Sequence, residues 1–429
     1  MIHYLLILLV GIVTSFYYFS FEFTALPGIN TKMAMGVVGI LVAVYRLAIK
    51  RDTVIPRNVF MVSLLAGLVS LVGVFSVIYN NTIDYAYATY LISMLVWLSA
   101  ALVLCTLIEK VHGYLNVELV CHYLIVVSVA QCLMALLIDF NPLVKRIVDT
   151  YISQDQDFLN EVGRLYGIGA WLDVAGTRFS ACLIMIAFLI NKNKECLSFS
   201  QIRFYIVSYV IIGLVGNMIA RTTSVGIVIG LLYLFFIFKP WKFLVSKSSF
   251  GIWRHVLMAL VIITPIVFTL YTTNEQFQKL FRFAFEAFFN YIEKGEFNTS
   301  STDRLQTMYI FPESLETWVV GDGYFSKPTN DPNYIGSLKG AYYVGTDVGY
   351  LRFIFYFGLI GLIAFSTFII YSAQTCMKNL FCYKAMFVLL LLSNFVIWLK
   401  VSTDIFLVFA IFICVANMQK EQEPYKLEK

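Results

Sequence analysis

The chain has 429 residues, of which 60% are hydrophobic and 13% are charged, and its formal net charge is +5. An ordinary soluble domain is about 45–50% apolar and about 25% charged. The composition, with a mean hydropathy of +0.79, therefore argues against a soluble enzyme, a disordered protein and a nucleic-acid-binding protein.

Twelve segments are apolar enough for membrane helices, which need about 20 residues to cross the hydrocarbon core. They are predicted at 3–21, 33–49, 59–79, 86–108, 115–138, 177–190, 203–220, 222–238, 255–271, 348–372, 384–399 and 402–417. The first lacks a cleavage-like site of small residues and is interpreted as a retained helix rather than a signal peptide. We therefore expect an all-α integral membrane protein, with residues 1–429 forming one polytopic domain.

The distribution of lysine and arginine predicts the orientation of these helices. One set of connections carries 17 cations, whereas the short connections on the other side hold only Lys32, Arg221 and Lys400. Cytoplasmic loops are enriched in lysine and arginine, so the first set and both termini are predicted to be cytoplasmic. The segments 139–176 and 272–347 then become two long external loops.

Histidine and cysteine limit the chemistry available on the external side. The four histidines lie near the predicted inner ends of spans, and no cysteine lies in an external loop. The sequence thus predicts no external disulfide framework, no external histidine for acid–base chemistry and no histidine metal site. We expect neither a metal nor another cofactor.

Both external loops contain amphipathic patterns. In the first loop, Leu143, Ile147 and Tyr151 recur at helical spacing, and Arg164 follows in a glycine-rich stretch. In the second, apolar residues recur from Phe277 to Tyr291, which predicts a helix lying in the membrane interface. A further helix is expected to begin at 301–303. The simplest interpretation of the Phe-rich helix is a membrane anchor.

Arginines at the outer ends of spans are candidates for anion binding. Arg221 lies at the tip of a tight hairpin between two predicted spans, where a cation must either snorkel or meet an anion. Arg178 and Arg352 occupy comparable positions. Arginine remains charged and binds phosphate through two donors, so fixed arginines can stabilise a diphosphate leaving group without a metal.

Three sequence stretches resemble the O-antigen polymerase (Wzy-type) family and, more distantly, the O-antigen ligases. They are Ala220-Arg221-Thr222-Thr223, the loop from Asp303-Arg304-Leu305 to Trp318-Val319-Val320-Gly321-Asp322-Gly323, and Thr346-Asp347-Val348-Gly349-Tyr350-Leu351 followed by Phe357-Gly358-Leu359-Ile360-Gly361-Leu362. The strict Arg-x10-Gly spacing described for some polymerase loops is not present after Arg164 or Arg304.

The resemblance implies a polyprenyl-sugar transferase (GT-C-type) architecture at the bacterial inner membrane. The implied reaction is metal-independent and inverting, and it transfers a growing glycan from polyprenyl diphosphate to a hydroxyl of a lipid-linked repeat unit on the periplasmic side. A chain-length regulator and a flippase are possible partners, and no nucleic acid is expected. Arg221 and Arg304 would correspond to essential arginines. Asp347, where ligases carry histidine, would be the catalytic base.

Weaker predictions and alternatives remain open. Arg164, Arg178, Arg352 and Tyr350 are predicted to bind substrate, and Asp347 could instead cap its helix. Competing functions are an O-antigen ligase or cell-wall glycan synthase, a lipid-linked oligosaccharide flippase or other transporter, and a structural partner without activity. Against a transporter, no repeat is visible and the charges lie at span ends rather than mid-membrane.

Overall fold

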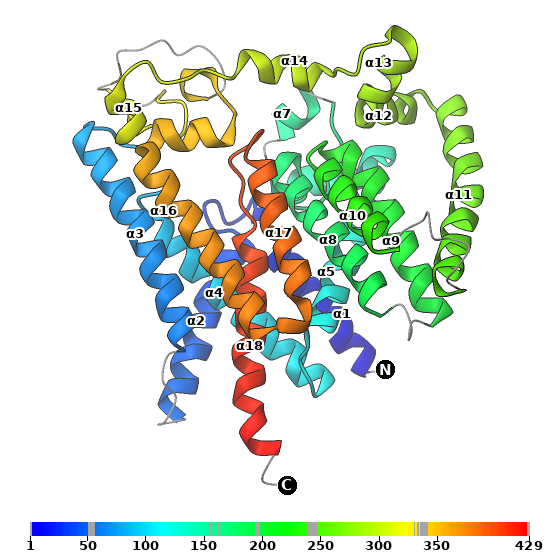
Figure 1. The fold of residues 1–429 in the computed structure, drawn as a ribbon, viewed down its shortest axis with the longest axis horizontal. Helices are drawn as coiled ribbons and strands as arrows, with labels where there is room; N and C mark the ends of the chain where they lie inside the picture. Colours follow the sequence, from blue (N-terminus) through cyan, green and yellow to red (C-terminus); the bar gives the residue numbers. More distant parts are fainter. Residues whose placement is uncertain are drawn as a thin grey trace. The chain divides into compact units, whose positions relative to one another are not determined.

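The computed structural model describes residues 2–49, 56–154, 156–161, 163–193, 198–238, 247–329, 331–332, 334 and 342–426. Figure 1 follows the chain from the N-terminus in blue to the C-terminus in red. The chain forms two compact units, each assembled from two stretches of sequence. The first comprises Met1–Thr31 and Asn116–Asn298, and the second comprises Lys32–Leu115 and Thr299–Lys429.

Besides its helices, the first unit contains a short antiparallel strand pair, in which Glu22 lies opposite Ser153 and Phe23 opposite Ile152. Its elements are α1 (Ile2–Tyr18), β1 (Glu22–Phe23), α5 (Val117–Phe140), α6 (Pro142–Tyr151), β2 (Ile152–Ser153), α7 (Gln156–Glu161), α8 (Leu172–Lys192), α9 (Phe199–Ile219), α10 (Thr223–Phe238), α11 (Lys247–Thr273), α12 (Glu275–Ala284) and α13 (Glu286–Lys294).

Helix α8 is the centre of the first unit, where it packs against α5, α9 and α10. Its residues from Ala175 to Ile190 are all buried. Small side chains allow the closest approach: a Cβ atom at Gly226 of α10 would overlap the backbone of Ser180 in α8. The Ser180 hydroxyl also donates to the Thr222 carbonyl at 2.8 Å. Close packing of small residues is a common basis for helix association in membranes.

The second unit is built around α16, which packs against α3, α17 and α18. Its elements are α2 (Thr31–Ile49), α3 (Arg57–Tyr79), α4 (Tyr90–His112), α14 (Ser300–Thr307), α15 (Leu315–Val319), η2 (Tyr343–Gly345), α16 (Gly349–Asn379), η3 (Phe381–Tyr383), α17 (Lys384–Ile397) and α18 (Phe406–Lys426). Buried aromatic rings fill its centre, with Trp398 packed against Phe353 and Phe365.

Among the described residues, six helices are long and apolar enough to cross a membrane. They are Arg57–Tyr79, Tyr90–His112, Val117–Phe140, Leu172–Lys192, Phe199–Ile219 and Gly349–Asn379. The expected all-α, membrane-embedded class is therefore confirmed. A helix also lies at each of the other predicted spans, although their crossing and the orientation remain predictions.

Several helix boundaries differ from those expected. Helix α8 begins at Leu172 rather than 177, because Asp173 in its first turn is favourable at a helix N-terminus although it lowers the local hydropathy. The expected amphipathic helix over 277–291 forms two helices, because Phe285 leaves the helical conformation at φ −117° and ψ 28°. The short amphipathic helix expected from the spacing of Leu143, Ile147 and Tyr151 is present as α6.

Candidate functional site

In the second unit, Asp347 and Arg352 lie together where the chain enters α16. Their side chains approach to 3.6 Å and are 21% and 12% exposed, respectively. This distance exceeds a normal hydrogen bond, so the contact is an ion pair without a hydrogen bond between these atoms. The N-cap position of α16 is Val348, and no side chain caps the helix. The alternative that Asp347 is the N-cap is therefore wrong.

Neutral acceptors and aromatic rings hold the Arg352 guanidinium. One terminal nitrogen donates to the Ser402 hydroxyl at 2.9 Å, and the other donates to the Phe325 carbonyl at 3.0 Å. The guanidinium carbon lies 3.9 Å from the ring centre of Phe325 and 4.6 Å from that of Tyr342. Its Nε is buried and meets no acceptor among the described residues. The site thus holds a cation in a fixed position.

A break in α16 lies ten residues after Asp347. Phe357 and Gly358 are not helical, and Gly358 has φ +67°. A broken membrane helix leaves carbonyl groups without their usual donors, which must come from elsewhere in the protein. Here the loop after α15 supplies them: the Asp322 amide donates to the Phe355 carbonyl at 2.6 Å, and the Gly323 amide donates to the Tyr356 carbonyl at 3.1 Å.

The glycines of this loop are required by its close approach to α16. Gly321 has φ +82°, and a Cβ atom there would lie 2.6 Å from the Phe357 amide nitrogen. A Cβ atom at Gly358 would in turn overlap the Val319 carbonyl. The Gly-Asp-Gly motif is therefore a docking contact between a loop and a membrane helix, a role that sequence spacing did not indicate.

Arg304 lies on α14, which is attached beside the start of α16. The helix begins with a capping box between Thr299 and Thr302, one residue earlier than the predicted start. Leu305 and Met308 pack against the cluster formed by Val348, Leu351, Ile354 and Phe355. The Thr346 hydroxyl donates to the Met308 carbonyl at 2.7 Å. The structure thus joins the segments that carry Arg304 and Asp347, and the Arg304 side chain is exposed.

Tyr350 faces α17. Its hydroxyl donates to the Phe395 carbonyl at 3.0 Å, and its ring packs edge-on against Trp398. These contacts fix the start of α16 and show a packing role for the side chain. Its predicted contact with substrate stays a prediction.

A polar network beside this site was not anticipated. The Asp322 carboxylate accepts hydrogen bonds from Thr317 at 2.7 Å and from Tyr343 at 3.0 Å. Burial raises the pKa of Asp322 above its ordinary range, and the two hydrogen bonds oppose that shift. Burial also raises the pKa of Tyr324 to about 12, aided by its hydrogen bond to Asp331. No local signal predicted these pairings, since the residues are spread over the loop.

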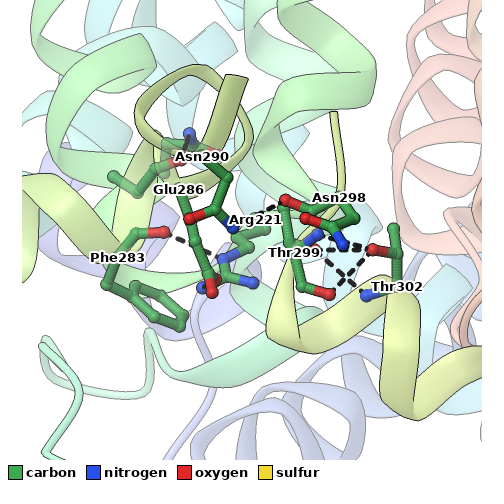
Figure 2. A network of polar contacts seen from close by, with 9 residues as sticks. Arg221, Phe283, Glu286, Asn290, Asn298, Thr299 and Thr302 are labelled. Carbon is green, nitrogen blue, oxygen red and sulfur yellow. Dashed lines mark hydrogen bonds and ion pairs between the residues drawn. The ribbon is translucent and has the colours of Figure 1, made fainter. Parts of the chain in front are cut away.

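In the first unit, Arg221 lies between α9 and α10 and reaches the junction of α12 and α13 (Figure 2). Its Nε donates to the Phe283 carbonyl at 2.9 Å, and its guanidinium forms an ion pair with Glu286. Asn217, one turn earlier, donates to the neighbouring Ala284 carbonyl at 2.7 Å. The two side chains therefore satisfy carbonyls at the end of α12, where helices lack internal donors.

Arg164 and Arg221 share one aromatic ring. Their guanidinium carbons lie 5.0 Å and 4.0 Å, respectively, from the ring centre of Phe283. Burial lowers the pKa of Arg221, Glu286 opposes this, and the positive charge of Arg164 adds to the lowering. Arginine still stays charged because its ordinary pKa is so high. The structure thus brings together two predicted arginines from distant stretches of sequence.

Arg178 differs from its predicted position at a span end. It lies in the second turn of α8, is 6% exposed, and its guanidinium lies 5.8 Å from the ring centre of Phe19.

Among the described residues, no group of three or more His, Cys, Asp and Glu side chains is arranged to hold a metal ion.

Comparisons with protein-family models, with curated proteins and with solved structures give no match.

Proposed function

We propose that the protein is a polysaccharide polymerase that transfers a growing glycan from polyprenyl diphosphate to a hydroxyl of a lipid-linked repeat unit. The observation that carries the proposal is the Asp347–Arg352 pair at the entrance to a broken membrane helix. It combines a proton acceptor with a fixed cation at the predicted external side. The polysaccharide would be an O-antigen, a capsule or an exopolysaccharide, assembled at the bacterial inner membrane.

In this proposal, Asp347 accepts the proton of the incoming hydroxyl as that oxygen attacks the anomeric carbon. The bond from that carbon to the diphosphate oxygen breaks, and the diphosphate leaves with the bonding electrons. A positioned carboxylate typically contributes about 10²–10⁴-fold as a general base. The Arg352 guanidinium is fixed by Ser402 and the Phe325 carbonyl, which supports a role in stabilising negative charge that develops on the substrate.

The arginines are assigned different tasks. Arg304 is exposed and its helix is docked beside Asp347, so it is the stronger candidate for the diphosphate. Arg221 already contacts Glu286 and the Phe283 carbonyl, so a diphosphate there must share these donors. Charge-assisted bidentate binding suits both arginines to phosphate.

The direct test uses purified protein in lipid with a synthetic polyprenyl-diphosphate-linked repeat unit and a chelator. We expect polymers of increasing length, with release of polyprenyl diphosphate. Release without chain growth would indicate hydrolysis, and unchanged repeat units would contradict the polymerase. Activity that disappears with the chelator and returns with Mg²⁺ or Mn²⁺ would contradict the metal-independent mechanism. Transfer of the repeat unit to a lipid A-core acceptor in place of polymer would identify a ligase.

A further inference from the structure

A polar cavity of about 390 Å³ lies in the first unit. It is bounded by the end of α5, by α6, by the segment 163–166 and by α12. This volume is within the range of about 300–1,000 Å³ that is typical of small-molecule sites. The charged side chains that line it are Asp139, Lys145, Arg164 and Lys279, so the lining carries three positive charges and one negative charge.

The positive charge of this lining is only partly neutralised, by the electrostatic interaction of Asp139 with Lys145. Within the part of the chain that the structure describes, neither Lys145 nor Lys279 approaches a carboxylate closely enough to form a salt bridge. The Asp139 carboxylate accepts a hydrogen bond from Gln276 at 2.6 Å. The positive charge of Arg221, which lies near Arg164, is neutralised by its ion pair with Glu286. The cavity lining therefore keeps a net charge of +2, which favours binding of an anion.

Helix α12 separates this cavity from a second one with different chemistry. The second cavity measures about 530 Å³ and is lined mainly by apolar and aromatic groups, among them Phe281 and Phe285. Lys279 and Phe283 line the polar cavity. Charged and apolar faces on one interfacial helix are suited to a ligand with a charged group and a hydrocarbon chain.

We propose that the polar cavity is a binding site for a phosphate or diphosphate group, held by Lys145, Arg164 and Lys279. The apolar cavity across α12 favours a lipid headgroup over a free phosphate as the source of this group. Two lysine ammonium groups and one guanidinium, less the charge of Asp139, give a net charge of +2, which matches the double negative charge of a phosphomonoester or diphosphate. Neither lysine belongs to the proposed transfer site, so the binding site does not depend on glycosyl transfer.

The experiment measures binding by thermal unfolding of the purified full chain, because a ligand that binds only the folded state raises its Tm. Inorganic diphosphate is titrated in uncharged detergent at constant ionic strength, and phosphatidic acid is titrated in mixed micelles against phosphatidylcholine. We expect phosphatidic acid to raise the Tm. Lys279→Gln and the double variant Lys145→Gln/Lys279→Gln should weaken the apparent affinity, by about tenfold for each charge-assisted hydrogen bond that the substitution removes.

Lys294→Gln is the matched control, because Lys294 is an exposed lysine of α13 outside the cavity lining. It removes the same charge and should bind like the unmodified protein. A Tm increase with diphosphate that requires Lys279 would support the site with free phosphate as its source. No increase with either probe, or equal losses of affinity in Lys279→Gln and Lys294→Gln, would overturn the proposal. Lys279 is exposed, so its single variant keeps the test available if the double variant does not fold.

Discussion

The Arg352 guanidinium lies 3.6 Å from the Asp347 carboxylate, while its two terminal nitrogens donate to Ser402 and to the Phe325 carbonyl. The arginine is thus held by neutral acceptors and does not depend on the carboxylate for its position. This arrangement allows the charge of Asp347 to be removed without releasing Arg352, which makes the pair suitable for mutational analysis.

Asp347→Asn keeps the size of the side chain and removes both its charge and its capacity to accept a proton. If Asp347 is the base, turnover should fall by about 10²–10⁴-fold with little change in Tm. The measurement is the rate of polymer formation with purified protein and lipid-linked repeat unit. If Asp347 only orients the acceptor, KM should rise more than kcat falls. Turnover near that of the unmodified protein would remove Asp347 from the mechanism.

Two arginine variants should differ in stability, although the proposed mechanism predicts that both lose polymer formation. They are Arg304→Ala and Arg221→Ala. Arg304 is exposed, and surface changes usually alter stability by less than about 0.5 kcal/mol. Arg221→Ala removes the partner of Glu286 and a donor to Phe283, so its Tm should fall. Thermal unfolding and polymer gels on the same preparations separate a loss of stability from a loss of polymer formation. Lysine should restore activity poorly at either position because it lacks the bidentate fork.

Gly321→Ala and Gly358→Ala should strongly destabilise the second unit. An added Cβ atom meets backbone in both cases, and backbone cannot rotate away as a side chain can. Gly113→Ala is the control: Gly113 has a similar φ of +75°, and nothing lies within 4 Å of its added Cβ atom. The stability lost in Gly113→Ala should be limited to conformational strain of about 1–2 kcal/mol. Comparable Tm losses in all three variants would contradict the packing argument.

Asp322 should make stability depend on pH. Its pKa is raised in the folded protein, so the folded state binds this proton more tightly than the unfolded chain does. The contribution of Asp322 to the free energy of unfolding is therefore complete below the ordinary carboxyl pKa of about 4. It is lost as the pH rises through the raised pKa of the folded state. Asp322→Asn should remove this component from a plot of Tm against pH. An unchanged plot would show that other groups determine it.

The orientation can be tested by labelling with a membrane-impermeant thiol reagent. Ser153 and Ser326 lie in the two predicted external loops, and Cys382 is an exposed natural thiol on the predicted cytoplasmic side. In intact cells with a permeabilised outer membrane, Ser153→Cys and Ser326→Cys should be labelled in a Cys382→Ser background. Cys382 should react only in inverted vesicles. The reverse pattern would overturn the orientation and the external location of the proposed transfer.

Sequence patterns predicted the local features of this fold well. Hydropathy located the apolar helices, and helical periodicity located α6 and the α12–α13 region, because both signals depend on neighbouring residues. Contacts between distant stretches gave no such signal. The Arg221–Glu286 pair spans 65 positions, and the contact of Gly321 with the break in α16 depends on how a loop packs. The division into two units likewise interleaves the sequence.

The docking of Gly321-Asp322-Gly323 onto the interruption of α16 has a mechanical consequence. If this loop lifted away, the Phe355 and Tyr356 carbonyls would lose their donors in a setting with little water, at a cost of several kcal/mol. The loop should therefore stay hydrogen-bonded to α16 throughout the proposed transfer reaction. In the proposed reaction, any opening that admits a bulky glycan to Asp347 must come from segments that do not bridge the interruption, and α14 with its exposed Arg304 is one of them.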